Sequence, residues 1–388
     1  MSNLHHTNKS TGHHMDDWID IRDLLLRLAN SSLPFTDIHI EQGAPVVVRM
    51  PSGWVRVDTL DGFDHFFPLE IQHEDIARLL DGVEKDWRKF ISAGKAVARP
   101  IVLTDYRMRC NAYPTCGNTG LAVSVRRLPR RPPNPGDIGL PEYVIKQTGR
   151  SKGLILVTGP TGAGKTTTIA SLLGHINKTR SAHIITIEKP IEYVIERELS
   201  IISQKEVGSD TGSFAEGLEE ALQQRPSVLF IGEIRDKASA ETTLHAAESG
   251  HLVFATMHSS SVSGALSKLV SFFPGEEREA KMVALANNLI YAIGQNLASS
   301  PDEKSLLLVA EVLVNSPKLA KLIMDPGGIS RIPEMMQMAS DDKSSRLMNS
   351  ILMEMLRAKQ ITPTEAIRIS YDPIPLQDLI MRHMQQAR

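Results

Sequence analysis

The sequence predicts an α/β protein that combines an N-terminal α+β domain, a core with a mostly parallel sheet, and a helical C-terminal part. Short apolar runs alternate with helical patterns from 153 to 313, and such alternation is typical of a parallel sheet covered by helices on both faces. A proline-rich stretch at 126–141 separates this region from the part of the chain before it.

The composition is that of an ordinary globular protein, with 41% hydrophobic and 23% charged residues. The net charge of −2 argues against a protein held to nucleic acid mainly by phosphate contacts, so we expect no nucleic-acid partner. Two cysteines, Cys110 and Cys116, exclude a disulfide scaffold and a multi-cysteine zinc module. No apolar run approaches the roughly 18 residues needed to span a bilayer.

The first part of the chain divides into a polar leader and a small domain. Residues 1–15 are predicted to be a disordered leader, in which two His-His pairs could bind a metal only loosely. Residues 16–127 form the predicted N-terminal domain. Its expected helices are 16–30 and 72–97, and its expected strands are 36–42, 46–50, 99–113 and 121–128.

Residues 128–141 form a predicted linker rich in proline and arginine. The surrounding stretch 126–141 holds five prolines and two glycines, which prevent a helix or a central strand. We interpret it as a solvated basic hinge between two domains.

Residues 142–388 form the predicted core domain. Its strand-like runs are GLILVTG (153–159), HIITIE (183–188), SVLFIGE (227–233), HLVFATM (251–257) and SLLLVAEVL (305–313). From about residue 316 the pattern is helical. An apolar stripe from Leu347 to Leu356 favours a core or a subunit interface over a cofactor site.

A complete phosphate-binding loop follows the first core strand and precedes a helix pattern. It fits GxxxxGK[ST], in which glycines let backbone N–H groups point at phosphate oxygens and the helix N-terminus adds positive charge. Lys165 should reach the β- and γ-phosphates of a nucleotide, and Thr166 should hold Mg²⁺. The predicted nucleotide-binding residues are Gly159, Pro160, Thr161, Gly162, Ala163, Gly164, Lys165, Thr166 and Thr167.

Two acidic residues stand at the ends of later core strands. Glu188 ends the run 183–188, with Glu192 one turn further. Because open α/β sheets bind ligands at the carboxyl ends of strands, Glu188 could polarise an attacking water. Glu233 follows a Walker-B-like apolar run and would order Mg²⁺ through water. Arg235 and the aspartate after it could equally form a structural salt bridge.

Two histidines, His251 and His258, flank one apolar strand. They cannot bind one zinc ion together, because a strand of this length holds its two ends apart. His258 is at the carboxyl end, where we expect it to hydrogen-bond to the γ-phosphate; the alternative is a buried core histidine.

Four motifs in this order resemble the secretion ATPase superfamily, in particular its PilT/DotB branch. They are GPTGAGKT (159–166), TIEKPIEY (186–193), GEIRD (232–236) and GHLVFATMH (250–258), and they match the family's Walker A, Asp box, Walker B and His box. The segments TDIH (36–39), YRMRCNAY (106–113), VRRLP (125–129) and IPEMMQ (332–337) extend the resemblance over nearly the whole chain after residue 16.

This resemblance implies a homohexameric ATPase that binds ATP and Mg²⁺, with a PAS-like N-terminal domain and a RecA-like core in each protomer. The family's catalytic acids map onto Glu188 and Glu233, and its phosphate-reaching arginines map onto Arg109, Arg126 and, less directly, Arg107. Such motors work at the cytoplasmic face of the inner membrane, so secretion or pilus platform proteins in that membrane are the implied partners.

Departures from the family pattern bear on which machine is implied. Lys189 replaces the aspartate of the usual TIEDPIE, which DotB-like proteins also lack, and the linker RRPPNPGDIGLP resembles theirs. The PilT C-terminal signature survives only as LAKLIMDPGG (319–328). The sequence therefore favours a type IVB secretion or conjugation ATPase, with a PilT-type pilus retraction motor as the alternative.

Three other classes share some of these features. A DNA helicase or recombinase would also have a P-loop and form a ring, but the net charge gives little support for a basic channel. A small-molecule kinase is disfavoured by the separate N-terminal domain and the lack of an evident lid. A nucleotide-binding scaffold that hydrolyses nothing is supported by Lys189 and opposed by Glu188 and Glu233.

Overall fold

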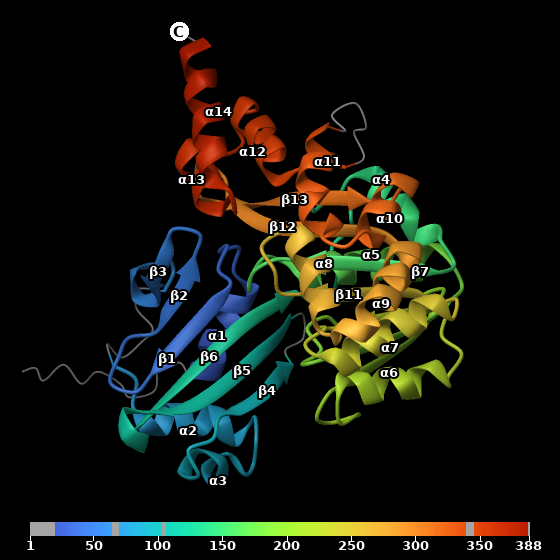
Figure 1. The fold of residues 1–388 in the computed structure, drawn as a ribbon. Helices are drawn as coiled ribbons and strands as arrows, with labels where there is room; N and C mark the ends of the chain where they lie inside the picture. The colour runs from blue at the N-terminus through green and yellow to red at the C-terminus, as the bar shows by residue number, and fades with distance from the viewer. Residues whose placement is uncertain (1–19, 64–69, 103–105, 130, 339–344, 387–388) are drawn as a thin grey trace, which may run out of the picture. The chain divides into compact units, whose positions relative to one another are not determined.

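The computed structural model describes residues 20–63, 70–102, 106–129, 131–338 and 345–386, and it divides the chain into two compact units (Figure 1). The first unit is Met1–Leu128 and the second is Pro129–Arg388. The predicted leader 1–15 lies outside the described residues. Within the described ranges, no helix is both long enough and apolar enough to cross a membrane.

The first unit is an antiparallel sheet with amphipathic helices. Its elements are α1 (Ile21–Asn30), β1 (Asp37–Glu41), β2 (Val47–Met50), β3 (Gly53–Arg56), α2 (His73–Asp81), α3 (Trp87–Ser92), β4 (Val97–Val102), β5 (Tyr106–Thr115) and β6 (Gly120–Pro129). The strands pair in the order β3-β2-β1-β6-β5-β4. The expected helix 72–97 is two helices, because Gly82 caps α2. The expected strand 99–113 belongs to β4 and β5, which pair with each other.

The second unit is built on a seven-stranded sheet with the order β13-β12-β7-β11-β10-β8-β9. The strands are β7 (Gly153–Thr158), β8 (His183–Glu188), β9 (Ile201–Glu206), β10 (Val228–Ile231), β11 (Leu252–Met257), β12 (Leu289–Ser299) and β13 (Leu306–Val314). β12 and β13 pair antiparallel, and the other neighbours pair parallel. The mostly parallel sheet is therefore confirmed, although β9 and β12 were not predicted.

Helices cover both faces of this sheet. The short α4 (Glu142–Lys146) and α5 (Lys165–Thr179) pack on one face. The other face is covered by α6 (Phe214–Leu222), α7 (Lys237–Glu248), α8 (Val262–Ser271), α9 (Gly275–Asn288), α10 (Pro317–Met324) and α11 (Ile332–Met338). The central strands read as continuous apolar runs because both of their faces are buried.

The C-terminal helices form a separate layer on the sheet's β12–β13 edge (Figure 1). They are α12 (Met348–Arg357), α13 (Pro363–Ile369) and α14 (Pro373–Gln386). Their buried side chains pack with Ala298 of β12 and Val309 of β13. The expected helical C-terminal part is confirmed, and with it the predicted fold class.

The proline-rich segment is packed on the second unit instead of forming a solvated hinge over its whole length. The Ser171 hydroxyl of α5 donates a hydrogen bond of 2.7 Å to the Pro133 carbonyl. A Cβ on Gly174 would lie 3.6 Å from Pro132, and the Arg131 guanidinium lies 3.0 Å from Glu196. These contacts hold the segment along α5, so the two units join close to Pro129.

Candidate active site

The phosphate-binding loop connects β7 to α5 and is anchored on β12. Gly159 approaches β12 so closely that a Cβ there would lie 2.3 Å from the Gln295 carbonyl oxygen. Gly164 caps α5 in the left-handed conformation, with φ +81°, which glycine adopts without strain. The buried Gln295 side chain donates a hydrogen bond of 2.6 Å to the Ala163 carbonyl. The loop thus depends on a strand that the sequence pattern missed.

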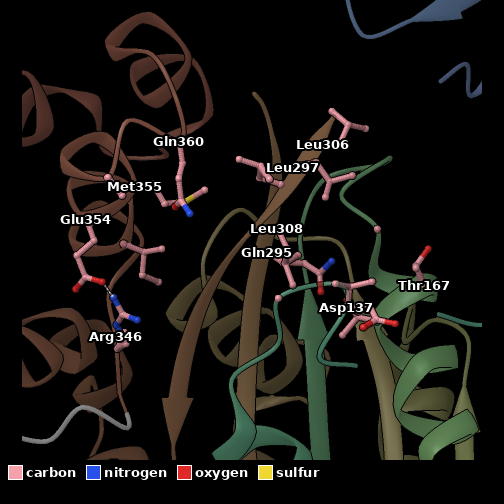
Figure 2. Close-up of a pocket in the computed structure, with 17 residues that line it drawn as sticks. Asp137, Thr167, Gln295, Leu297, Leu306, Leu308, Arg346, Glu354, Met355 and Gln360 are labelled. Carbon is pink, nitrogen blue, oxygen red and sulfur yellow. Dashed lines mark hydrogen bonds and ion pairs between the residues drawn. The ribbon is translucent and has the colours of Figure 1, made fainter. Parts of the chain in front are cut away.

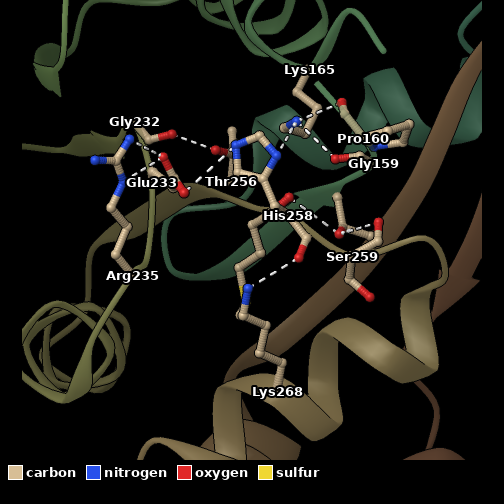
Figure 3. A network of polar contacts seen from close by, with 12 residues as sticks. Gly159, Pro160, Lys165, Gly232, Glu233, Arg235, Thr256, His258, Ser259 and Lys268 are labelled. Carbon is tan, nitrogen blue, oxygen red and sulfur yellow. Dashed lines mark hydrogen bonds and ion pairs between the residues drawn. The ribbon is translucent and has the colours of Figure 1, made fainter. Parts of the chain in front are cut away.

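Lys165 lies at the centre of a polar network beside this loop (Figure 3). Its Nζ is 2.8 Å from the Gly159 carbonyl, 3.0 Å from the Pro160 carbonyl and 3.4 Å from His258 Nδ1. Burial lowers the pKa of Lys165, and the carboxylates of Glu233 and Glu192 oppose this effect. The loop carbonyls therefore hold the Lys165 ammonium group where it can donate hydrogen bonds to an anionic phosphate bound in the loop.

His258 is fixed next to Lys165 by contacts on both sides of it in the chain. The Thr158 hydroxyl, at the end of β7, donates to the carbonyls of Met257 (3.2 Å) and Ser259 (3.0 Å). His258 Nε2 is 3.6 Å from Glu233 Oε1. Burial, with help from the charge of Lys165, lowers the pKa of His258. A neutral imidazole can donate from one nitrogen and accept at the other.

Glu233 follows β10 and pairs with a neighbouring arginine. Arg235 Nε lies 2.6 Å from Glu233 Oε2. Arg235 and Asp236 do not form the salt bridge that the sequence suggested. Asp236 instead accepts the Ser239 backbone N–H at 2.8 Å and caps α7. The structure therefore brings Glu233, His258 and Lys165 together at the carboxyl ends of the central strands, as Figure 3 shows.

Glu188 is more deeply buried than Glu192 and Glu233 and is only 5% exposed. Its Oε1 accepts hydrogen bonds from the Thr186 hydroxyl (2.6 Å) and from Gln204 Nε2 (3.1 Å). Burial raises the pKa of the Glu188 carboxyl to about 7. Glu192 was not among the residues predicted to be catalytic, and it interacts electrostatically with Lys165. Two carboxylates of one motif thus have different surroundings.

The raised pKa of Glu188 predicts a pH-dependent gain in stability for Glu188→Gln. As the pH rises from the ordinary glutamate pKa to about 7, the unfolded chain loses this proton before the folded protein does, so the wild type loses stability. Glutamine carries no charge and keeps an oxygen for both donors. We expect a gain on the order of 1–3 kcal/mol above about pH 7 that vanishes near pH 4.5. Thermal unfolding of the wild type and the variant across this pH range measures the gain in stability. An equal gain at all pH values would contradict the prediction.

A pocket of about 620 Å³ extends from the end of the phosphate-binding loop to α12 (Figure 2). Gly164 and Thr167 line one side, and Ile351 and Met355 of α12 line the other. Leucines from β12 and β13, namely Leu297, Leu306, Leu307 and Leu308, add apolar surface. An Arg346–Glu354 ion pair stands at the side of the pocket. The apolar stripe 347–356 therefore supplies part of a pocket as well as core.

The predicted arginines all belong to the first unit. Arg126 of β6 donates from Nε to Asp37 Oδ1 of β1 at 2.8 Å, and Arg109 of β5 is half-buried. The side chain of Arg107 lies outside the described residues. The neighbouring Arg127 is structural, since it donates to the carbonyls of Ala29 and Leu33. That Arg109 and Arg126 reach phosphates stays a prediction.

Magnesium fits the oxygen donors beside the loop. Thr166 is the second residue of α5, directly after Lys165, and Glu233 supplies a carboxylate within the same network. Hydroxyl, carboxylate, phosphate and water oxygens are the ligands that Mg²⁺ prefers. The donor set is therefore compatible with an ion held by Thr166 and, through water, by Glu233.

Comparisons with known proteins identify the family of this chain. Residues 97–359 match the family model described as "Type II/IV secretion system protein". The chain is 33% identical over 312 residues to the type IV pilus retractation ATPase PilT of Pseudomonas aeruginosa, covering 79% of this chain and 86% of the relative.

Solved structures give the same result. The pilus retraction motor PilT with bound ADP has a TM-score of 0.78 at 34% identity, covering 93% of this chain and 99% of that one. The Legionella pneumophila ATPase DotB also has a TM-score of 0.78, over 90% of this chain and 95% of that one, and at 24% identity it supports the fold alone. The chain belongs to the type II/IV secretion system protein family and to its PilT/DotB branch.

Proposed function

We propose that this protein hydrolyses ATP with Mg²⁺ at the phosphate-binding loop. The observation that carries the proposal is the cluster of Lys165, His258 and Glu233 beside a complete loop. Lys165 neutralises the β- and γ-phosphates, and residues 159–167 wrap them with backbone N–H groups. Mg²⁺, held by Thr166 and through water by Glu233, supplies charge neutralisation for the transferred phosphoryl group. His258 donates a hydrogen bond to the γ-phosphate.

Activation of the attacking water is proposed for the acids of the TIEKPIEY motif. A carboxylate near the γ-phosphate can orient water and accept its proton. Glu188 has a pKa of about 7, which suits proton transfer at neutral pH, whereas Glu192 interacts directly with the charge of Lys165. We infer that Glu192 shares this role with Glu188, with Glu188 also fixing the end of β8 through Thr186 and Gln204.

The pocket beside the loop is proposed to take the nucleoside part of ATP. It begins at Gly164 and Thr167, where the phosphates end, and its leucine and Met355 side chains suit the apolar faces of a base. The PilT structure with bound ADP is consistent with a nucleotide in a protein of this fold.

We propose that the protein acts as a homohexameric motor at the cytoplasmic face of an inner membrane, bound to platform proteins there. In this proposal the first unit brings Arg109 and Arg126 to the phosphates when the units move about the join near Pro129. Hydrolysis would then be coupled to domain motion, because an arginine supplied from another body stabilises transition-state charge only when it is in place.

Arg109→Ala and Arg126→Ala are expected to lower ATP turnover by at least about tenfold, since supplied arginines contribute about 10³–10⁵ in other P-loop enzymes. Lysine should not restore the rate, because it lacks the planar guanidinium. Steady-state phosphate release measures the effect, and size-exclusion chromatography checks that the assembly is intact. Arg127→Ala, which removes a structural arginine, is the comparison. Wild-type turnover in both variants would leave these arginines as surface charge.

The machine that we propose is a type IVB secretion or conjugation system. Lys189 and the proline-rich segment support it, while the 33–34% identity to PilT proteins supports pilus retraction as the second candidate. Deleting the gene in its own bacterium separates the two. Loss of conjugation or protein delivery with normal pilus retraction supports the first; loss of pilus retraction with hyperpiliation supports the second and contradicts the first.

A further inference from the structure

Glu311 joins three separate segments of the second unit although it lies in the core. It belongs to β13 and is 1% exposed. Its Oε1 accepts the backbone N–H of Val262 at 3.0 Å. Its Oε2 accepts the backbone N–H of Met348 at 3.1 Å and the hydroxyl of Tyr371 at 2.5 Å. These partners are the first residue of α8, the first residue of α12, and the connection between α13 and α14.

The surroundings of Glu311 are suited to a carboxylate. Val262 and Met348 begin helices, whose N-termini attract negative charge. α12 is preceded by Leu347, whose side chain cannot cap it, so Glu311 provides the missing acceptor. Gly294 of β12 lies beside the contact between Glu311 and Val262: a Cβ there would lie 3.3 Å from Val262 Cγ1 and 3.5 Å from Glu311 Oε1. A buried carboxylate without these donors would be strongly unfavourable.

The segments that Glu311 joins lead to two parts of the proposed nucleotide site, the His258 loop and the pocket. α8 begins directly after the loop that carries His258, which contacts Lys165. α12 carries Ile351 and Met355, which line the pocket. A shift of α12 relative to α8 must stretch the hydrogen bonds to Glu311, because each of its two oxygens holds one helix N-terminus.

We propose that Glu311 is a positioning residue that ties the His258 loop to the pocket helix α12, so that the presence of a γ-phosphate is transmitted to the C-terminal helices. This inference rests on the proposed nucleotide site. In this proposal, a hydrogen bond to the γ-phosphate shifts His258, and α8 moves with it. Because Glu311 is hydrogen-bonded to α8, to α12 and to Tyr371, the last two move as well.

Hydrogen–deuterium exchange of the full chain with ADP and with a non-hydrolysable ATP analogue tests the inference. In the wild type, the analogue should protect α12 more than ADP does. Tyr371→Phe removes one of three donors to Glu311 and should reduce this difference by about two- to tenfold, the loss expected for one buried hydrogen bond. Glu311→Gln, whose single amide oxygen can accept from Val262 or from Met348 but not from both, should abolish it. Protection of α5 by either nucleotide should persist in Tyr371→Phe.

Tyr291→Phe is the matched control. The Tyr291 hydroxyl on β12 is buried and has no hydrogen-bond partner among the described residues, so its loss should leave the difference in α12 unchanged. An unchanged difference in Tyr371→Phe would overturn the inference. If neither nucleotide protected α5 in the wild type, the proposed function itself would fail and the inference with it.

Discussion

Lys165→Ala is expected to lower ATP turnover by at least about 10²–10³-fold, because removing one preorganised donor to transition-state charge has this effect in other enzymes. The amine is mostly buried between the loop carbonyls and His258. Lys165→Gln should show the same loss. Phosphate release at saturating ATP is the measurement.

A matched lysine on the same helix controls for charge and helix propensity. Lys178 lies near the C-terminal end of α5, where its ammonium contacts Asn134 at 3.4 Å, and Lys178→Ala should keep wild-type turnover. Circular dichroism and thermal unfolding show whether both variants are folded. Undiminished turnover in a folded Lys165→Ala protein would contradict the assignment of the loop.

The second large effect is expected for the acids. Glu192→Gln and Glu233→Gln should each lower kcat by about 10²–10⁴-fold, the range for a group that activates water or orders a metal, with ATP affinity changed little. Glu188→Gln should lower kcat less, by about tenfold, because its two hydrogen-bond donors can still be satisfied. Single-turnover hydrolysis and nucleotide titration separate the two effects. Equal losses at 188 and 192 would show that the two carboxylates contribute equally to activating water.

The sequence predicted the elements whose signal is local. The loop 159–166 has its own motif, and the buried parallel strands are continuous apolar runs. β12 was missed because its pattern is interrupted by polar residues such as Gln295, whose side chain holds the loop across 132 positions of sequence. β9 was missed because it is an edge strand with a half-exposed, mixed pattern.

The candidate site was predictable as a set of residues but not as a set of contacts. Motif order identified Glu188, Glu233 and His258, yet it could not show that Glu188 is bonded to Gln204 from β9, or that Arg235 pairs with Glu233. Those partners depend on the register between strands. Glu311 has no motif at all, since its partners come from three distant segments.

Hydrolysis of ATP by the loop and its acids can be measured as Mg²⁺-dependent phosphate release by the wild-type protein, beside ATP binding under the same conditions. We predict sustained release that requires Mg²⁺ and disappears in Lys165→Ala. Tight ATP binding by the assembled wild-type protein without any phosphate release would contradict the proposed hydrolysis and identify a nucleotide-binding scaffold instead.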